Sequence, residues 1–210
     1  MKVLLFNGSS NEHGCTFRAL KESAFSLEAN GIETEIIQVG KNAIRDCIGC
    51  GTCRKNGGEC VFTDDIVNEV IKKAKKADGF IFGSPVYYAH PSGRLLSFMD
   101  RLFYAGSSAL AFKPAAAVVS ARRAGTTASL DAITKHFTIN QMPVVSSNYW
   151  CMTHGAQNSP AQAEQDLEGM QIMRVLGQNM AWLLKCIEAG KNAGINHPQT
   201  EDKIMTNFIR

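Results

Sequence analysis

The sequence predicts a doubly wound α/β domain, in which helices cover both faces of a parallel sheet. The first observation is an alternation of five short apolar segments with segments of helical periodicity. The second is the first apolar segment, KVLLFN at 2–7, whose lack of polar alternation indicates a strand buried on both faces. The five expected strands cover 2–7, 33–39, 79–84, 115–120 and 143–147.

Helical patterns fill the intervals between these strands. Asn30-Gly31 is a typical helix end, Thr63-Asp64-Asp65 is a typical helix start, and the last helix keeps its apolar residues at helical spacing. The expected helices cover 16–29, 64–77, 92–105, 126–138 and 162–189. We expect residues 1–190 to form one domain and residues 191–210 to be a C-terminal tail.

Composition places the chain among ordinary globular proteins. It has 210 residues, 45% of them hydrophobic, which suffices to bury a core without disulfides or metal. The net charge is +3 with no long basic run, so nucleic acid is not indicated as a partner. The apolar run at 3–6 is too short for a signal peptide and no later run could span a bilayer, so we expect a cytoplasmic protein without a membrane partner. Seven cysteines in that compartment favour metal or redox chemistry over structural disulfides.

The expected loop after the first strand, GSSNEHGCT at 8–16, has the features of a phosphate-binding loop. Its glycines let backbone amides face a ligand, the helix start behind it favours an anion, and Ser9 and Thr16 add hydroxyl donors. It lacks the Gly-Lys-Ser/Thr of a P-loop, and its glycines do not fit the dinucleotide fingerprint. The pattern favours a terminal monophosphate, such as that of flavin mononucleotide (FMN). A capped helix start with a tight turn is the alternative.

The loops after the third and fourth strands are expected at the same edge of the sheet. SPVYYAHPSG at 84–93 offers a proline turn, two aromatic rings and amides that can bond the polar edge of a flavin. SARRAGTT at 120–127 offers hydroxyls, amides and two cations, so Arg122 or Arg123 could meet the phosphate of FMN or of NAD(P)H. A buried aromatic turn and a solvated arginine pair are the alternatives.

The segment CIGCGTCRKNGGEC at 47–60 holds four of the seven cysteines, with the spacing C-x2-C-x2-C-x6-C. A compact run of four thiolates suits a [4Fe-4S] cluster, and the glycines between them let the loop wrap closely. Structural zinc also takes four thiolates, but usually as two separated pairs. A dithiol switch, or cysteines without any cofactor, are the remaining interpretations. The candidate metal ligands are Cys47, Cys50, Cys53 and Cys60.

Taken together, these segments resemble NAD(P)H-dependent FMN reductases of flavodoxin-like fold, and in particular the iron–sulfur flavoproteins. The resemblance rests on GSSNEHGCT, SPVYYAHPSGRLLSFMDR, SARRAGTT, the cysteine segment and DLEGMQIMRVLGQNMAWLL, and it spans residues 1–190. It implies a five-stranded flavodoxin-like parallel sheet in three α/β/α layers, bound FMN, and a [4Fe-4S] cluster on the four cysteines.

The resemblance also implies which residues contact FMN. Ser9, Asn11, Cys15 and Thr16 would hold the phosphate. The ring would lie against Ser84, Pro85, Val86, Tyr87 and Tyr88, with further contacts from Ser120, Arg122, Arg123 and Gly125. The family often has an arginine in its first loop where this chain has Asn11, so phosphate binding here would depend more on amides and hydroxyls.

The expected function is that of an FMN-dependent NAD(P)H oxidoreductase that passes electrons to a quinone-like or protein acceptor, directly or through the cluster. No catalytic side chain is expected, because the flavin carries the chemistry. The resemblance implies a homodimer or homotetramer. One alternative is a non-enzymatic flavodoxin-type electron carrier, which the charge of +3 disfavours because such carriers are usually acidic. An FMN-only reductase with a cysteine redox loop and a redox-sensing module are the others.

Overall fold

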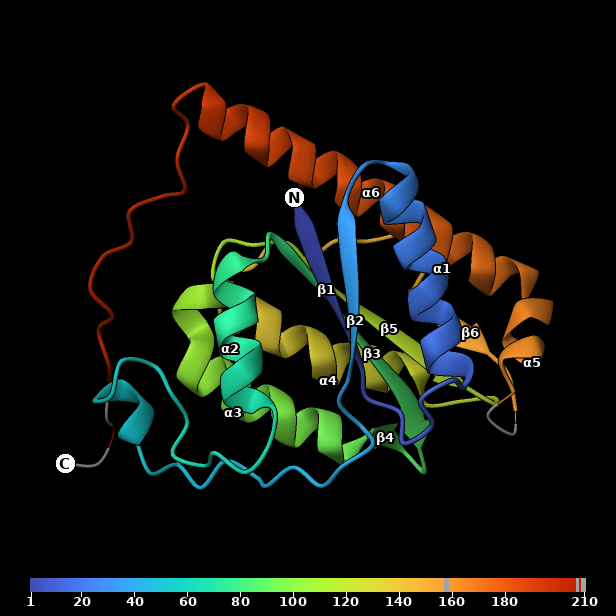
Figure 1. The fold of residues 1–210 in the computed structure, drawn as a ribbon, viewed down its shortest axis with the longest axis horizontal. Coiled ribbons are helices and arrows are strands. Elements are labelled where there is room, and N and C mark those ends of the chain that lie inside the picture. The colour runs from blue at the N-terminus through green and yellow to red at the C-terminus, as the bar shows by residue number, and fades with distance from the viewer. Residues whose placement is uncertain (157–158, 207, 209–210) are drawn as a thin grey trace.

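A computed structural model describes residues 1–156, 159–206 and 208 of the chain. It confirms the predicted fold class: a mainly parallel sheet lies between two layers of helices (Figure 1). The main strands follow the order β2-β1-β3-β5-β6, and the short strand β4 pairs antiparallel with β3. Without β4, this is the flavodoxin-like order 2-1-3-4-5.

The strands and helices have the following bounds. The strands are β1 Lys2–Asn7, β2 Glu33–Gln38, β3 Gly79–Tyr87, β4 His90–Pro91, β5 Ala115–Ala121 and β6 Met152–His154. The helices are α1 Cys15–Ala29, α2 Val67–Lys76, α3 Gly93–Leu110, α4 Thr126–Ile139, α5 Pro160–Gln165 and α6 Leu167–Asn192, with a 3₁₀ turn η1 at Thr52–Arg54.

The central strand β1 shows why the sequence folds into three layers. Val3 to Phe6 are fully buried, and successive side chains of a strand point to opposite faces of the sheet. Leu4 and Phe6 join the core under α2, α3 and α4, whereas Val3 and Leu5 join the core under α1 and α6. Because β1 is apolar on both faces, it contributes side chains to the two cores on opposite sides of the sheet.

The fifth strand differs from the prediction. We expected it at 143–147, but there only Val144 forms an isolated bridge, to Ala115 at the start of β5. The chain leaves the sheet edge after Val145 and returns as β6, beside the end of β5. The edge strand is therefore interrupted. Its first part is the single bridge within the apolar run PVVSS, and its second part is β6, whose residues show no strand pattern in the sequence.

The last helix is also divided, since α5 ends at Gln165 and α6 begins at Leu167. Asp166 lies between them and accepts a hydrogen bond from Gly169 N at 2.9 Å, as an N-cap residue does. The third strand continues to Tyr87, so the predicted loop at 84–93 begins inside β3 and turns through the β3–β4 hairpin.

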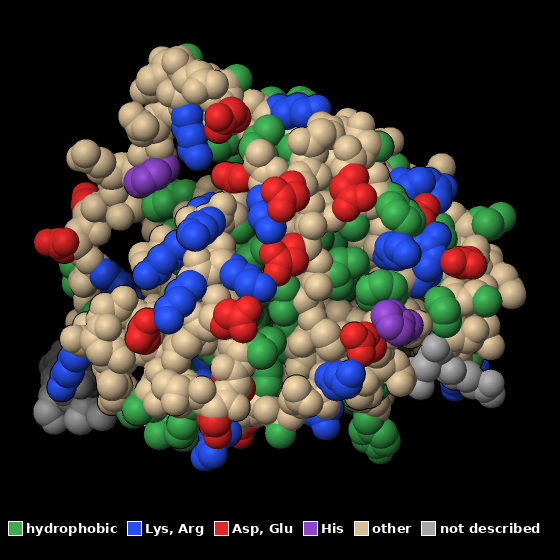
Figure 2. Space-filling model, viewed as in Figure 1, with side chains coloured by type: hydrophobic (Ala, Val, Ile, Leu, Met, Phe, Trp, Pro, Cys, Tyr) green, Lys and Arg blue, Asp and Glu red, His purple; other side chains and the backbone are tan. Residues whose placement is uncertain are grey.

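The segment after α6 contains no helix or strand in its described residues, 193–206 and 208. It runs back along the molecule to lie beside η1 (Figure 1), and His197 stacks on Phe112 with ring centroids 4.5 Å apart. Figure 2 shows Lys and Arg side chains gathered over α2 with acidic side chains among them, so this face has no continuous basic stripe. No helix in the described part of the chain is long and apolar enough to cross a membrane.

Candidate functional site

A pocket of about 150 Å³ lies at the carboxyl ends of β1, β3 and β5, where doubly wound sheets bind ligands. It is lined by Ser9, Cys15, Thr16, Pro85, Val86, Tyr87, Ser120, Ala121, Arg122, Gly155 and Ala156. Eight of these were expected from the sequence as cofactor contacts. We call this cavity the sheet-edge pocket.

The loop at Ser9 is fixed from two sides. Asn7 accepts a hydrogen bond from Ser9 N at 3.1 Å and donates to Glu12 O at 3.2 Å. Gln38, at the end of the neighbouring β2, donates to Ser9 O at 2.7 Å. Gly40 presses on the same backbone so closely that a Cβ there would lie 2.3 Å from Ser9 O. Sequence reasoning missed Asn7, although a buried polar residue ending an apolar strand could have drawn attention to it.

Two buried hydroxyls form the floor of the sheet-edge pocket. Thr16 Oγ1 and Ser120 Oγ lie 2.7 Å apart, and each residue is almost fully buried. Thr16 is in the first turn of α1, whose N-cap Gly14 provides no side-chain cap, so the first amides of the helix are left for an outside acceptor. Hydroxyls beside a helix N-terminus are a suitable receptor for a phosphate.

Cys15 begins α1 in the same pocket. Burial raises the pKa of its thiol, which donates a hydrogen bond to Ser159 O at 3.2 Å. A Cβ at Gly155 would lie 2.8 Å from Cys15 Sγ, so the glycine allows this contact. A neutral, buried thiol lines the pocket and has no nucleophilic character.

The β3–β4 turn closes the opposite wall. Tyr87 Oη lies 2.6 Å from Ser10 Oγ and accepts from Ser10 N at 3.2 Å, which joins the end of β3 to the loop after β1. Gly125, with φ of +88°, packs so close to Val86 that a Cβ would lie 2.8 Å from Val86 Cγ1. Gly125 therefore sets the position of Val86 from outside the lining.

Five residues expected as cofactor contacts lie outside this lining: Asn11, Ser84, Tyr88, Arg123 and Gly125. Ser84 is fully buried and accepts from Ser92 N at 2.9 Å, so it supports the turn. Asn11 donates its backbone N–H to Ser9 Oγ at 3.1 Å. Tyr88 has φ of +59° and a fully exposed ring. Contact with a bound cofactor stays a prediction for all thirteen expected residues, whether or not they line the pocket.

A second pocket, of about 160 Å³, gathers all four cysteines of the 47–60 segment, and we call it the cysteine pocket. Arg101, Tyr104 and Ala105 of α3 form its floor. Four glycines of the segment have positive φ, which glycine adopts without strain and which lets the chain turn tightly: Gly49, Gly51, Gly57 and Gly58. All four cysteines are free. The two pockets share no lining residue among those described.

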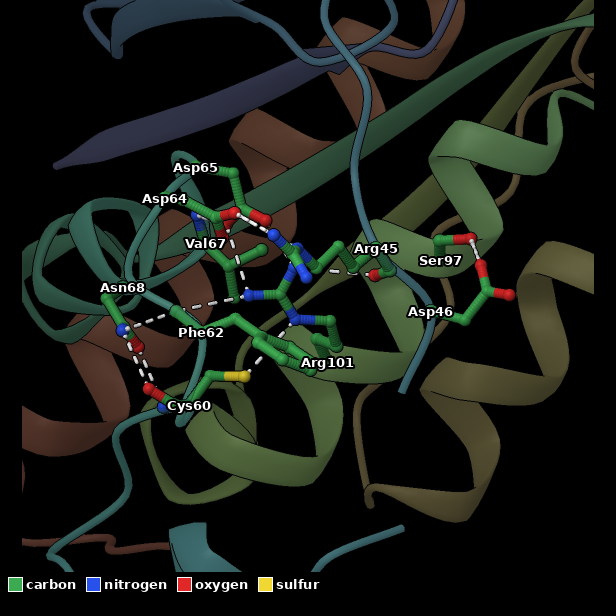
Figure 3. A network of polar contacts seen from close by, with 10 residues as sticks. All are labelled: Arg45, Asp46, Cys60, Phe62, Asp64, Asp65, Val67, Asn68, Ser97 and Arg101. Carbon is green, nitrogen blue, oxygen red and sulfur yellow. Dashed lines mark hydrogen bonds and ion pairs between the residues drawn. The ribbon is translucent and has the colours of Figure 1, made fainter. Parts of the chain in front are cut away.

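A network of polar contacts holds one side of the cysteine pocket (Figure 3). Arg101 of α3 is 1% exposed and forms an ion pair with Asp65. It donates Nε–H to Cys60 Sγ at 3.2 Å and Nη2–H to Phe62 O at 3.3 Å. Asn68 clamps the backbone of Cys60, accepting from its N at 2.7 Å and donating to its O at 2.9 Å. Sequence reasoning missed both Arg101 and Asp65.

Charges and hydrogen bonds differ around the individual cysteines. Burial alone would lower the pKa of Arg101, but the hydrogen bonds to Asp65 and Cys60 outweigh it and raise the pKa. The hydroxyl of Thr52 holds the pKa of the Cys50 thiol below its usual value. Cys53 donates to Tyr104 O at 3.6 Å. In the described part of the chain, no three His, Cys, Asp or Glu side chains are grouped closely enough to hold a single metal ion.

Comparison with known proteins gives a consistent assignment. Residues 1–157 match the NADPH-dependent FMN reductase family. An iron-sulfur flavoprotein of Methanocaldococcus jannaschii is 33% identical over 197 residues, which is 90% of this chain and 100% of the relative. An iron-sulfur flavoprotein of Methanosarcina thermophila is 26% identical over 91% of this chain and 100% of its own.

Solved structures show the same fold at low sequence identity. RosB with a bound 8-demethyl-8-formylriboflavin-5'-phosphate intermediate has a TM-score of 0.70 at 16% identity and covers all of this chain, which in turn spans 92% of RosB. An archaeal flavodoxin has a TM-score of 0.58 at 15% identity over 88% of this chain and 99% of its own. With the family match and the 33% identical relative, the resemblance expected from the sequence is confirmed: the chain belongs to the NADPH-dependent FMN reductase family, among the iron-sulfur flavoproteins.

Proposed function

We propose that the protein is an FMN-dependent NAD(P)H oxidoreductase that passes electrons to a quinone-like or protein acceptor through a [4Fe-4S] cluster on its cysteine loop. The observation that carries this proposal is the presence of two separate pockets. One has buried hydroxyls beside a helix N-terminus, and the other gathers four cysteines of one loop. FMN would supply hydride acceptance and one-electron transfer, and the cluster would supply a one-electron outlet.

In the sheet-edge pocket, the residues present fit a flavin monophosphate. Ser9 and Thr16 would donate hydroxyl hydrogen bonds to the phosphate, beside the free amides that begin α1. Pro85, Val86 and Tyr87 would hold the ring from one wall, with their position set by the turn and by Tyr87's contact to Ser10. Arg122 also lines the pocket, and its exposed cation would meet the phosphate of FMN or of incoming NAD(P)H. No side chain is assigned a proton-transfer role.

In the cysteine pocket, the residues present fit a cluster better than a single ion. Structural zinc usually takes its four thiolates as two well-separated pairs, whereas these four cysteines form one compact run in a single loop. In a cubane cluster each thiolate binds a different iron, which accommodates a wider cage. Cys47, Cys50, Cys53 and Cys60 would be its ligands. The buried guanidinium of Arg101 would offset part of the negative charge.

A second candidate is an FMN reductase whose cysteine loop acts as a thiol switch without iron. The exposed Cys50 favours it, because the lowered pKa of its thiol increases the thiolate fraction available for disulfide exchange. A non-enzymatic electron carrier remains the less favoured alternative, because such carriers are usually acidic and this chain has a net charge of +3.

The first experiment is the ultraviolet-visible spectrum of protein purified without oxygen, with iron and acid-labile sulfide assays on the same sample. The proposal expects flavin peaks over a broad iron–sulfur shoulder, and about four irons per chain. NADH and NADPH oxidation with a quinone acceptor is then measured under the same conditions. Flavin with no iron would favour the thiol-switch enzyme, and the absence of flavin would overturn the whole proposal.

We also propose that the protein forms a homodimer or homotetramer. Four large apolar residues of α3 are fully buried in the core and so are not available to an interface: Leu95, Phe98, Met99 and Leu102. Large apolar side chains nevertheless remain exposed on neighbouring surfaces, among them Tyr104 and Ile139. Light scattering at micromolar concentration tests this, and a monomer would contradict it.

A further inference from the structure

The cysteine pocket contains an arginine in an unusual position. Arg101 projects from the middle of α3 and is 1% exposed, whereas arginine is almost never fully buried unless it is paired. Its pairing partner is Asp65, whose side chain is 8% exposed. The two residues are 36 positions apart in the sequence, and Figure 3 shows the guanidinium of Arg101 between the carboxylate of Asp65 and the sulfur of Cys60.

Two of the three guanidinium nitrogens of Arg101, Nη1 and Nη2, donate to carbonyl or carboxylate oxygens. Nη1 and Nη2 donate to Asp65, and further to Arg45 O at 3.4 Å and Phe62 O at 3.3 Å. Nε is left, and it donates to Cys60 Sγ at 3.2 Å. A thiol is a weak acceptor and a thiolate is a strong one. This buried donor is therefore best satisfied when Cys60 is a thiolate, as it is when it ligates a metal.

The position of Cys60 does not depend on Arg101 alone. Asn68 holds the Cys60 backbone with two hydrogen bonds of 2.7 and 2.9 Å. Among the described residues, Cys60 alone of the four cysteines accepts a hydrogen bond from a charged side chain. The pocket is thus electrostatically asymmetric, with its buried cation against one ligand. Asn68 already fixes the backbone of Cys60, so the hydrogen bond from Arg101 is not needed to hold this residue in place. Its effect would instead fall on the charge of the sulfur.

We propose that Arg101, oriented by Asp65, is a positioning residue that raises the reduction potential of the [4Fe-4S] cluster through its Nε–H to Cys60 Sγ. The inference rests on the proposed function, since it requires a cluster on the four cysteines. The reduced cluster carries one more negative charge than the oxidised cluster. A buried cation and an N–H donor on a ligand sulfur stabilise that added charge, and hydrogen bonds to the sulfurs are an established determinant of cluster potential.

The test uses two double variants of the anaerobically purified protein. R101Q/D65N removes both charges of the buried pair, which avoids leaving one of them uncompensated. R45Q/D64N makes the same exchange in the exposed pair of the same segment, where Arg45 Nη2 lies 2.7 Å from Asp64 Oδ2 and contacts no sulfur. Iron content, FMN content and the cluster midpoint potential, followed by electron paramagnetic resonance, are measured for both variants and for the unmodified protein.

We expect R101Q/D65N to keep about four irons and to disfavour reduction roughly tenfold, because a hydrogen bond to a charged group is worth about that factor. For a one-electron couple, tenfold corresponds to a midpoint about 59 mV lower. The control variant and the FMN potentials should stay close to those of the unmodified protein. A purely structural role for Arg101 would lower iron content without moving the potential of the clusters that remain.

If R101Q/D65N loses FMN, and so has not folded, R101K decides the matter. Lysine keeps the charge but has no donor at the Nε position with the same geometry. A lowered potential in R101K supports the inference. A loaded, folded variant with the potential of the control overturns the inference and leaves the proposed function intact. An iron-free unmodified protein overturns both, and it is recognised before any variant is made.

Discussion

The sheet-edge pocket and the cysteine pocket are built by opposite means. The ends of three parallel strands and the start of α1 surround the sheet-edge pocket, and its polar groups Ser9, Thr16 and Ser120 are almost fully buried. The cysteine pocket lies on a loop that contains only the short turn η1, and no residue from 41 to 66 is fully buried. Its order comes from two helices, α2 and α3, through a few polar contacts such as Asn68 with Cys60 and Arg101 with Asp65.

This difference bears on how each pocket would respond to the loss of its proposed cofactor. The sheet-edge pocket is formed by the same packing that stabilises the whole domain, so it should exist without a ligand. The cysteine loop buries little apolar surface of its own, so coordination of the proposed cluster would be a main source of its stability. We therefore expect iron removal to loosen residues 41–66 and to leave FMN binding intact.

The largest expected effect comes from Cys60→Ala. Loss of one of four thiolates should abolish the cluster, so that iron falls from about four per chain to almost none while FMN stays bound. Iron, sulfide and flavin assays on anaerobic protein measure this. Cys186→Ala, which removes an exposed cysteine of α6, is the matched control and should keep its iron. Joint loss of iron and FMN in Cys60→Ala would show that the two pockets are not independent.

The next effect concerns the sheet-edge pocket. In Gly40→Ala the new methyl group would lie 2.3 Å from Ser9 O, and both chains there are backbone held by other hydrogen bonds. Overpacking of this kind costs about 1–3 kcal/mol, so FMN affinity should fall by roughly 10- to 100-fold. Flavin fluorescence titration of the deflavinated protein measures it.

Gly190→Ala is the control for this substitution, because its Cβ would meet only Ile195 Cβ at 3.9 Å. Iron content should be unchanged in both variants. If Gly40→Ala bound FMN as tightly as the control does, the loop at Ser9 would not be the phosphate site.

A smaller effect is expected from Thr16→Val, which keeps the shape of the side chain and removes the hydroxyl 2.7 Å from Ser120 Oγ. A lost hydrogen bond to a charged phosphate weakens binding by about 1.5 kcal/mol, or roughly tenfold in Kd. Thr138→Val, in an exposed turn of α4, is the matched control. Equal FMN affinity in the two variants would remove Thr16 from the phosphate contacts.

The sequence was sufficient for the sheet-edge pocket because the signals that define it are local. Strand ends, a glycine loop and hydroxyls at a helix start are adjacent in the chain, and parallel strands bring their carboxyl ends together whatever the register. Ser9, Thr16, Pro85 and Ser120 were all found in this way. Asn11 and Tyr88 belong to the same segments but lie outside the lining, since a motif fixes which loop is used without fixing each side chain.

Features that depend on distant contacts could not be predicted. A buried arginine in α3 is favourable only once Asp65 and Cys60, 36 and 41 positions away, have folded against it. The predicted position of the fifth strand was wrong for a similar reason. The segment that pairs with the end of β5 is Met152–His154, and the more strand-like run at 143–147 forms only one bridge. Asp166 divides the last helix because its carboxylate caps α6, a tertiary choice that periodicity does not reveal.

The last prediction concerns an ion-pair network that joins α1 to α6 on one face of the sheet, outside both pockets. Glu22 of α1 is a largely buried carboxylate that bonds Arg174 of α6 and Arg18, and these contacts hold α1 against α6. Burial alone would raise the pKa of Glu22, but the two arginines outweigh it and lower the pKa below its usual 4.5. The ionised carboxylate therefore stabilises the fold above pH 4.5, and this contribution is lost as the pH falls through the depressed folded-state value.

Glu22→Gln should lower the unfolding free energy by about 1 kcal/mol near pH 7, with the deficit shrinking below pH 4.5, where the unmodified protein loses the same contribution. Urea unfolding of the deflavinated protein at several pH values measures this, with the exposed Glu188→Gln as control. Because Glu22 contacts neither pocket lining, iron content and FMN affinity at pH 7 should stay unchanged. A deficit independent of pH would mean that the Glu22 side chain acts through packing and that its charge is irrelevant, so the helix layer would be held by shape alone.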